Sequence, residues 1–406
     1  MNPRETRIDQ YDFELSEEFI PAFPLPERDA SKLLLCKQGV IQHRQFMELP
    51  DILESDDLLV FNNTKVIPAR LLFKKETGAF IEVFCLEPIG ITHQDAMMKT
   101  GQSRWKCFVG GAKKWKEEQV IFIEAHTAGG EHFRIEATRL TSEEGTFELE
   151  FNWTPSELSF SEVLDLIGRI PLPPYIKREA TLFDVERYQT ILAKTPGSVA
   201  APTAALHFTD RVLNQLQTKG VQRIEVTLHV GAGTFKPVSS QTLGEHDMHA
   251  EVVQVSIAAI EQLLDRSKGR NIAVGTTSMR TLETLYWMGV KLLQYGTSHA
   301  NDELVLSQWD PYELTPVNRR DALQALLDYA KERSQEHISI TTSVLIAPGY
   351  TFRICDGLIT NFHMPKSTLI VLVAALIGDR WREVYQSAIT ERYRFLSYGD
   401  SSLLIP

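Results

Sequence analysis

The spacing of hydrophobic and polar positions changes twice along the chain and predicts two kinds of structure. Between residues 71 and 166, short apolar stretches such as IEVFCLE, WKCFVG and GTFELEF alternate with turn-forming residues. This pattern is typical of a small antiparallel β-barrel. After residue 167, helical stretches such as DRVLNQLQTKG alternate with buried strand-like runs such as IEVTLHV and NIAVGTT. That alternation predicts an α/β domain.

The barrel is predicted to be an insertion, because the N-terminal segment that ends in DDLLVFNNTKVIPAR is also expected to belong to the α/β domain. We therefore expect an α/β catalytic domain over residues 1–70 and 167–406, and an inserted β-barrel domain over residues 71–166. Residues 285–341 contain the helix-like stretch RRDALQALLDYAKERSQ and are expected to be an extra segment on the main domain.

Composition agrees with a folded protein of two domains, since 406 residues with 43% hydrophobic and 23% charged residues are ordinary values for globular chains. No apolar run reaches the roughly 18 residues that span a bilayer, and the first residues lack the apolar core of a secretion signal. A cytoplasmic location is expected. The four cysteines show no paired spacing, which argues against a disulfide framework and a thiolate zinc site. The net charge of −11 argues against indiscriminate binding of nucleic acid.

Polar residues gather in a few segments that follow the apolar runs, and five of the eleven histidines lie there: His207, His229, His246, His249 and His363. Histidine titrates nearest neutrality, so this grouping favours proton transfer. Any single histidine near a strand end can instead satisfy a backbone group.

Two glycine- and threonine-containing segments predict ligand contacts. In VTLHVGAGTF, Gly231 and Gly233 follow a buried run and allow the backbone to approach a ligand, although the full G-x-G-x-x-G spacing is absent and a tight turn is the alternative. In AVGTTSMRTLE, Thr276, Thr277 and Arg280 lie at a helix start, where a polar ligand group or simple capping would explain them.

His246 and His249, three residues apart and flanked by Glu245 and Glu251, could bind a metal. The H-E-x-x-H signature is absent, and the same residues could form an acid/base network. In LITNFHMPKST, Asn361 and His363 follow an apolar run at a position where α/β proteins bind ligands, and Asp356 lies just upstream. A polar loop that opens the next helix is the alternative.

Taken together, these segments resemble the S-adenosylmethionine:tRNA ribosyltransferase-isomerase family of queuosine biosynthesis. The matching words occur in the family's order from about Tyr11 to the end, apart from the middle segment: FNNTKVIPARL, GRIPLPPYIKR, DVERYQT, GSVAAPTAALHFT, VTLHVGAGTFKPV, HDMHAE, AVGTTSMRTLE, PGYTF, LITNFHMPKSTL and YRFLSYGD. The resemblance implies transfer and isomerisation of the ribosyl group of S-adenosylmethionine onto the 7-aminomethyl-7-deazaguanine at the wobble position of tRNA. Epoxyqueuosine-tRNA would form, with release of adenine and methionine.

The implied reaction needs a general base, a proton donor and a dry site, but no metal. On this basis the expected catalytic residues are His207, His249, His363, Asp356, His229 and Glu251, with Glu251 orienting an imidazole. The sequence does not assign base and acid among them. The expected cofactor contacts are Gly231, Gly233, Thr276, Thr277, Arg280 and Asn361. The expected RNA contacts are Lys65, Arg70, Tyr175, Lys177, Arg178, Lys113, Lys114 and Lys116. A monomer without membrane contacts is expected.

The chain departs from the family pattern at a few positions. Ala205 stands for a glycine, Ser343 for an acidic residue, and Val252 and Val253 for an aromatic pair. These departures keep open the alternative of a diverged, non-catalytic RNA-binding paralogue. The pair of His246 and His249 keeps open a second alternative, a metal-dependent hydrolase.

Overall fold

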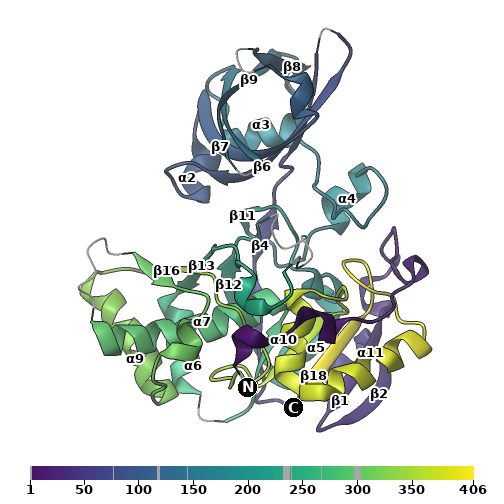
Figure 1. Cartoon of the computed structure of the whole chain (residues 1–406), viewed down its shortest axis with the longest axis vertical. Coiled ribbons are helices and arrows are strands. Elements are labelled where there is room, and N and C mark those ends of the chain that lie inside the picture. Colours follow the sequence, from purple (N-terminus) through teal and green to yellow (C-terminus); the bar gives the residue numbers. More distant parts are fainter. Residues whose placement is uncertain are drawn as a thin grey trace.

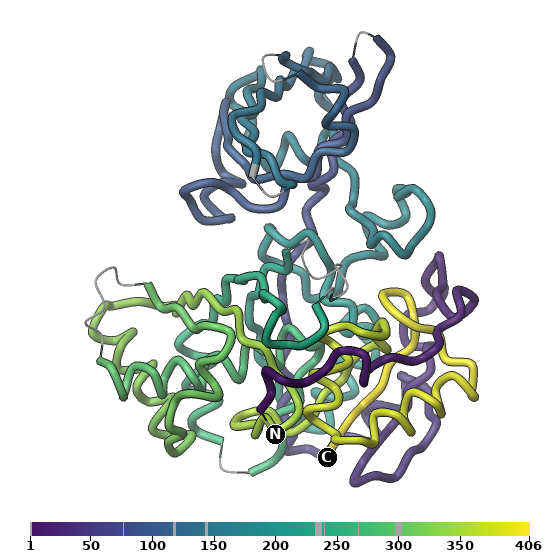
Figure 2. The backbone as a smooth tube through the Cα atoms, viewed as in Figure 1, coloured from purple at the N-terminus to yellow at the C-terminus, as the bar shows by residue number. Residues whose placement is uncertain are grey.

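The computed structural model describes residues 2–75, 77–116, 119–143, 145–231, 238, 240–266, 268–296 and 303–406. Figure 1 shows a ring of barrel strands above a larger body in which helices pack around a sheet. Both chain ends lie in the larger body, at the side away from the barrel (Figure 2).

The larger body is built on one mixed sheet of ten strands. In sheet order, the strands are β15 (Leu304–Leu306), β16 (His337–Thr342), β13 (Glu251–Ser256), β12 (Gln222–Leu228), β3 (Leu58–Asn62), β14 (Asn271–Val274), β17 (Gly357–Asn361), β18 (Ser401–Ile405), β1 (Lys32–Lys37) and β2 (Val40–Gln45). Strands β12, β3, β14 and β17 run parallel to one another in this order, so their carboxyl ends meet at one edge of the sheet.

Alternate residues of the central strands enter different cores, as the pleat of a strand requires. Leu58 and Val60 of β3 point into one core, whereas Leu59 and Phe61 point into the other. The first core is covered by α6 (Ile257–Asp265), α7 (Thr276–Tyr295), α9 (Arg319–Glu332), α10 (Thr368–Ile377) and α11 (Trp381–Thr390). The second is covered by α1 (Leu49–Ile52) and α5 (Asp210–Lys219). Near-continuous apolar strands follow from this double burial.

The inserted part is a nearly closed antiparallel sheet of six strands with its own apolar core. The strands are β5 (Arg70–Lys74), β6 (Phe80–Pro88), β7 (Gln102–Gly110), β10 (Thr146–Thr154), β9 (His132–Glu143) and β8 (Ile121–His126). Helix α3 (Phe160–Ile167) packs into this core, and α2 (His93–Met98) projects toward the larger body. The predicted fold class, an α/β main domain with an inserted small antiparallel barrel, is confirmed.

A short neck joins the barrel to the main domain. Its two passages pair with each other, because the backbone N–H groups of Arg70 and Arg169 each donate to the other's carbonyl oxygen, at 3.2 and 2.9 Å. Beyond them, β4 (Thr64–Val66) and β11 (Thr195–Ser198) pair in parallel. A Cβ on Gly168 would lie 2.0 Å from the carbonyl oxygen of Pro68, so only glycine fits between the passages.

The segment at residues 285–341 is part of the main sheet and its helical cover. Residues 285–295 continue α7, the described part of the segment includes α8 (Asp310–Glu313), and α9 contains most of the predicted helix. Strand β16 pairs along its whole length with β13. The four cysteines are buried free thiols. Among the described residues, no helix is both long enough and apolar enough to cross a membrane.

Candidate functional site

A cavity of about 370 Å³ lies at the carboxyl ends of the parallel strands; we call it the strand-end cavity. Its wall includes Val230 just after β12, Thr276 at the start of α7 after β14, and Asn361 at the end of β17. Ligands of open α/β sheets bind at this edge. The polar segments that follow the buried runs in the sequence therefore converge here.

The lining of the strand-end cavity carries no Asp, Glu, Lys or Arg among the described residues. It combines the aromatic rings of Tyr175, Tyr188 and Phe362 with hydroxyl and amide groups. Mostly apolar walls with a few placed polar groups are typical of sites for small organic ligands.

The start of α7 forms one wall of this cavity. Gly275 adopts φ +92°, a region that L side chains rarely enter, and its N–H donates to Ile359 O at 2.8 Å. Thr276 and Thr277, the first two residues of the helix, line the cavity. The hydroxyl of Thr277 is buried without a hydrogen-bond partner among the described residues. Free N–H groups and this hydroxyl leave unmet hydrogen-bonding capacity at the wall.

Asn361, at the end of β17, presents a second unmet group. Its Nδ2 contacts Leu396 O at 2.9 Å and His207 Nε2 at 3.3 Å, while Oδ1 is buried without a partner among the described residues. An amide NH₂ can only donate, so Nε2 of His207 must accept. The remaining His207 N–H, at Nδ1, then donates to Ser31 Oγ at 2.9 Å.

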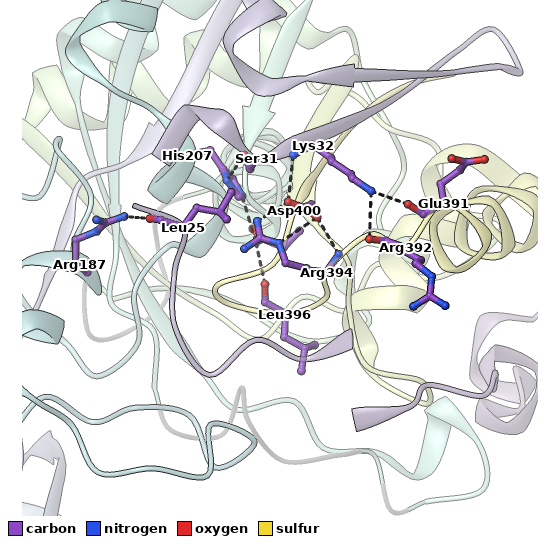
Figure 3. Close-up of polar contacts among 11 residues, drawn as sticks. Leu25, Ser31, Lys32, Arg187, His207, Glu391, Arg392, Arg394, Leu396 and Asp400 are labelled. Atoms are coloured by element: carbon purple, nitrogen blue, oxygen red, sulfur yellow. Dashed lines mark hydrogen bonds and ion pairs between the residues drawn. The ribbon is translucent and has the colours of Figure 1, made fainter. Parts of the chain in front are cut away.

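His207 lies behind the strand-end cavity and acts on it through Asn361. Figure 3 shows its ring beside Ser31, near the ion pair of Arg394 and Asp400. Burial is the main reason that the pKa of His207 falls to about 4, and Asp400 opposes the shift. The imidazole is neutral near pH 7 and orients the amide of Asn361.

His363 is the one histidine among the described residues that lines the strand-end cavity. Its Nε2 lies 3.0 Å from Thr360 Oγ1, and its backbone N–H donates to Tyr385 OH at 3.1 Å. Burial lowers the pKa of His363 to about 3. The imidazole is therefore neutral near pH 7 and leaves one ring nitrogen unprotonated at the wall.

A second cavity of about 760 Å³ lies between the barrel and the main sheet; we call it the junction cavity. Barrel residues 86–88 and 90–94 form one side, and the other side is formed mainly by the end of β12 and by β13 and β16. On β13 and β16, alternate residues such as Val253 and Ile340 enter the core, while Gln254 and Ser339 face the cavity. Val230 lines both cavities, so they meet at the end of β12.

His229 is at the wall of the junction cavity. Its Nδ1 lies 3.0 Å from Thr64 Oγ1, and its ring stacks on that of His93 with centroids 5.0 Å apart. Burial, followed by the repulsion of His93, lowers the pKa of His229 to about 3. Gly231 also lines this cavity, whereas Gly233 lies outside the described residues.

Glu251 and Arg280 form a buried ion pair, with Nη1 donating to Oε2 at 2.5 Å. Glu251 lines the junction cavity. The expectation that Glu251 orients an imidazole is corrected, because its partner is a guanidinium. Arg280 also donates from Nε to Val344 O at 3.2 Å and is absent from the strand-end lining, which removes it from the direct ligand contacts there.

Two other expected catalytic residues lie away from the cavities. Asp356 precedes β17, so it lies at the amino end of the strand, roughly 16 Å from Asn361 at about 3.3 Å per residue. Its carboxylate accepts from the Asn271 N–H at 2.9 Å. The expectation that Asp356 is catalytic is therefore corrected, because the direction of β17 places it at the opposite edge of the sheet from the cavity. His249 is exposed and does not line either cavity.

The rival metal site has no support from the described geometry. His246 is half-buried, with its pKa lowered by burial and then by His249. Within the described ranges, no group of three or more His, Cys, Asp or Glu side chains is placed to hold a metal ion.

The expected RNA contacts divide into residues with internal partners and exposed residues. Arg178 holds buried Asp184 through two bonds of 2.7 Å, and we correct it to a structural residue. Arg70 pairs with Glu82, and Lys177 pairs with Glu17 at 2.5 Å. Tyr175 lines the strand-end cavity and its hydroxyl lies 2.7 Å from Ser397 Oγ; burial raises its pKa to about 12.

Four lysines expected to contact RNA are exposed: Lys65 on β4, and Lys113, Lys114 and Lys116 on the barrel. Lys75, just after β5, donates from Nζ to the backbone carbonyl of Lys114. Because β5 runs from the neck at Arg70 to its far end at Lys74, the three-lysine cluster lies at the far end of the barrel.

The sequence analysis did not select several residues that line the strand-end cavity and the junction cavity. Ser397, Thr360 and Tyr188 line the strand-end cavity, and His93 reaches the junction cavity from the barrel. Ser397 belongs to the polar segment RYRFLSYGD and could have been selected from it. Nothing in the sequence around His93 distinguishes that residue.

This chain resembles known proteins over nearly its whole length. A family model described as "Queuosine biosynthesis protein" matches residues 8–404. A relative from Desulfitobacterium hafniense, named S-adenosylmethionine:tRNA ribosyltransferase-isomerase, is 39% identical over 404 residues, which are 98% of this chain and 100% of the relative. A crystal structure of an S-adenosylmethionine tRNA ribosyltransferase from Thermotoga maritima is 28% identical, covering 98% of this chain and 100% of that one, with a TM-score of 0.46. The full-length match shows that this chain belongs to the queuosine biosynthesis protein family.

Proposed function

We propose that this chain is an S-adenosylmethionine:tRNA ribosyltransferase-isomerase. It transfers and isomerises the ribosyl group of S-adenosylmethionine onto 7-aminomethyl-7-deazaguanine in the wobble position of tRNA. The products are epoxyqueuosine-tRNA, adenine and methionine. The observation that carries the proposal is the pair of cavities that meet at Val230, since a transfer between two bulky substrates needs two adjoining sites.

The strand-end cavity is the proposed site for S-adenosylmethionine. Its volume of about 370 Å³ and its aromatic and hydroxyl lining suit an adenosyl group. Thr276, Thr277 and Asn361 are the proposed contacts, because the buried Thr277 Oγ1 and Asn361 Oδ1 lack partners among the described residues. The bound co-substrate supplies a sulfonium that acidifies the neighbouring ribose 5′ protons.

His363 is the proposed general base. Its neutral imidazole lines the same cavity, and its bonds to Thr360 and Tyr385 fix the ring and its backbone. A buried site also excludes water from reactive intermediates. His207 is a positioning residue that holds Asn361.

The RNA is proposed to lie along the barrel and the neck. Lys65, Lys113, Lys114 and Lys116 are exposed cations for phosphate contacts. Residues 1–70 and 167–406 are proposed as the catalytic domain and residues 71–166 as the inserted domain. A monomeric, metal-free, cytoplasmic enzyme remains a prediction from the sequence.

Release of adenine tests the proposal. The folded protein is incubated with S-adenosylmethionine and a tRNA that carries the aminomethyl base, and adenine is measured by chromatography. Adenine and a matching gain in RNA mass are expected. A folded protein that retains the tRNA without forming adenine would point instead to the non-catalytic RNA-binding alternative, and activity that disappears on chelation would revive the metal alternative.

A further inference from the structure

The lining of the junction cavity combines three carboxylates with uncharged polar side chains. Glu87, Glu251 and Glu303 line it, and the described lining contains no Lys or Arg. Carboxylates repel phosphate groups and attract cations, and among the described residues only Glu251 of these three has a cationic partner, Arg280. The chemistry of this wall is therefore opposite to that of a backbone-binding groove.

Glu251 places an acceptor at the inner part of this wall. The residue is 7% exposed and its Oε2 is held by Arg280. No other described group bonds its carboxylate, so Oε1 remains available to a ligand in the cavity.

His229 supplies a second acceptor. Thr64 Oγ1 lies 3.0 Å from His229 Nδ1 and 3.4 Å from Thr195 O. In the tautomer in which Nδ1–H donates to Thr64 Oγ1, the lone pair of the imidazole lies on Nε2. His229 lines the junction cavity and immediately precedes Val230, where the two cavities meet.

His93 fixes the plane of the His229 ring from the barrel side. The two rings are stacked, with 25° between their planes. Gly197 packs against both: a Cβ there would lie 2.9 Å from His229 Cε1 and 3.1 Å from His93 Cβ. Segments from the barrel, the neck and the main domain therefore meet at one pair of imidazoles.

We propose that the junction cavity binds the acceptor base through a primary ammonium group, which donates to Glu251 and His229, and that His93 is a positioning residue contributed by the barrel. This inference rests on the proposed function and specifies how its acceptor is recognised. The ammonium lies beside Val230, next to the cavity proposed for the co-substrate.

The test compares two RNA hairpins that differ in one base, 7-aminomethyl-7-deazaguanine or guanine, at the wobble position of an anticodon stem–loop. Dissociation constants are measured by fluorescence anisotropy without co-substrate. The wild-type protein should bind the amine hairpin about tenfold more tightly, the usual effect of hydrogen bonds to a charged group. Glu251→Gln and His93→Ala should bring that ratio close to one, with guanine-hairpin affinity unchanged.

Matched variants separate positioning from a general structural effect. His93→Phe keeps a stacking ring and should restore the ratio, and it remains informative if His93→Ala does not fold. Gly197→Ala pushes the two rings apart and should abolish the discrimination. His126→Ala, an exposed histidine of the same barrel, should leave it unchanged.

A wild-type ratio near one, or a ratio that survives in Glu251→Gln, would overturn the inference. Adenine release separates this result from failure of the proposed function. Release with no discrimination would refute only the ammonium site. Discrimination that follows the variants, with no adenine formed, would support the ammonium site and refute the transferase reaction.

Discussion

The two cavities of this protein differ in charge and in the parts of the chain that build them. The strand-end cavity has an uncharged described lining, and the loops of the main domain and the adjoining residues 174–204 form it. The junction cavity is acidic and exists only where the barrel meets the main sheet. Under the proposed function, co-substrate binding depends on the main domain, whereas acceptor recognition also depends on how the barrel packs against that domain.

The largest expected effect is on chemistry in the strand-end cavity. Replacing His363 with Ala should lower the rate of adenine release by about 10²- to 10⁴-fold, the usual contribution of a general base. The ratio of amine to guanine hairpin affinities, a property of the junction cavity, should not change.

His43→Ala is the matched control, because His43 is exposed and its ring contacts Tyr393 OH, away from both cavities. A rate for His363→Ala that stays within about threefold of wild type would remove His363 as the base, since proton transfer is worth far more.

A buried carboxylate supports one cavity and not the other. Asp184 accepts from Arg178 and from Tyr398 OH at 2.8 Å, and Tyr398 follows the loop residues Leu396 and Ser397 of the strand-end wall. Asp184→Ala leaves the charge of Arg178 without its partner. This should lower the free energy of unfolding by about 3–5 kcal/mol. Denaturant unfolding measures this decrease, and co-substrate affinity should fall before hairpin discrimination does.

The carboxyl group of Asp184 also makes the free energy of unfolding depend on pH. Burial alone would raise the pKa of Asp184, but hydrogen bonds from Arg178, Thr181 and Tyr398 outweigh it and lower the pKa to about 2. A carboxyl whose pKa is lowered by folding stabilises the protein above its unfolded pKa and loses this contribution as pH falls toward 2. About 2 kcal/mol should disappear between pH 5 and 2, at roughly 1.4 kcal/mol per unit. Asp184→Asn should flatten that part of the stability curve, and an unchanged curve would contradict the assignment.

The smallest predicted effect concerns the far end of the barrel. Replacing Lys113, Lys114 and Lys116 with Ala should weaken tRNA binding about tenfold for any base at the wobble position. The salt slope should fall by about one unit for each phosphate that is no longer neutralised. Binding measured at several salt concentrations checks this. An unaltered slope would place the RNA elsewhere, and a change in base discrimination would mean that the lysines act on the junction cavity.

Residue patterns located the strand-end cavity well, because polar residues directly after buried runs lie at the carboxyl edge of a parallel sheet. Thr276, Thr277, Asn361 and His363 follow this rule. Asp356 did not, since it comes before its strand and so lies at the opposite edge. Whether a residue comes before or after its strand determines which edge of the sheet it reaches. Its distance in sequence from the strand does not.

The remaining features depend on tertiary contacts that local patterns do not encode. Arg280 and Glu251 are 29 positions apart and form an ion pair only because the fold brings α7 and β13 within reach of each other. His93 reaches the site because α2 of the barrel packs against β11, and no spacing in its own segment predicts this contact. Residues 285–341 contribute β15 and most of β16 to one end of the main sheet, and this pairing with distant strands is not visible in the sequence of the segment.

A crystal structure of the protein with S-adenosylmethionine and the amine-bearing hairpin tests the central claim most directly. The account predicts the adenosyl group against Tyr175, Thr277 and Asn361, and the aminomethyl group beside Glu251 and His229 on the other side of Val230. Density for either ligand outside these two cavities, or an amine that contacts neither acceptor, would contradict it.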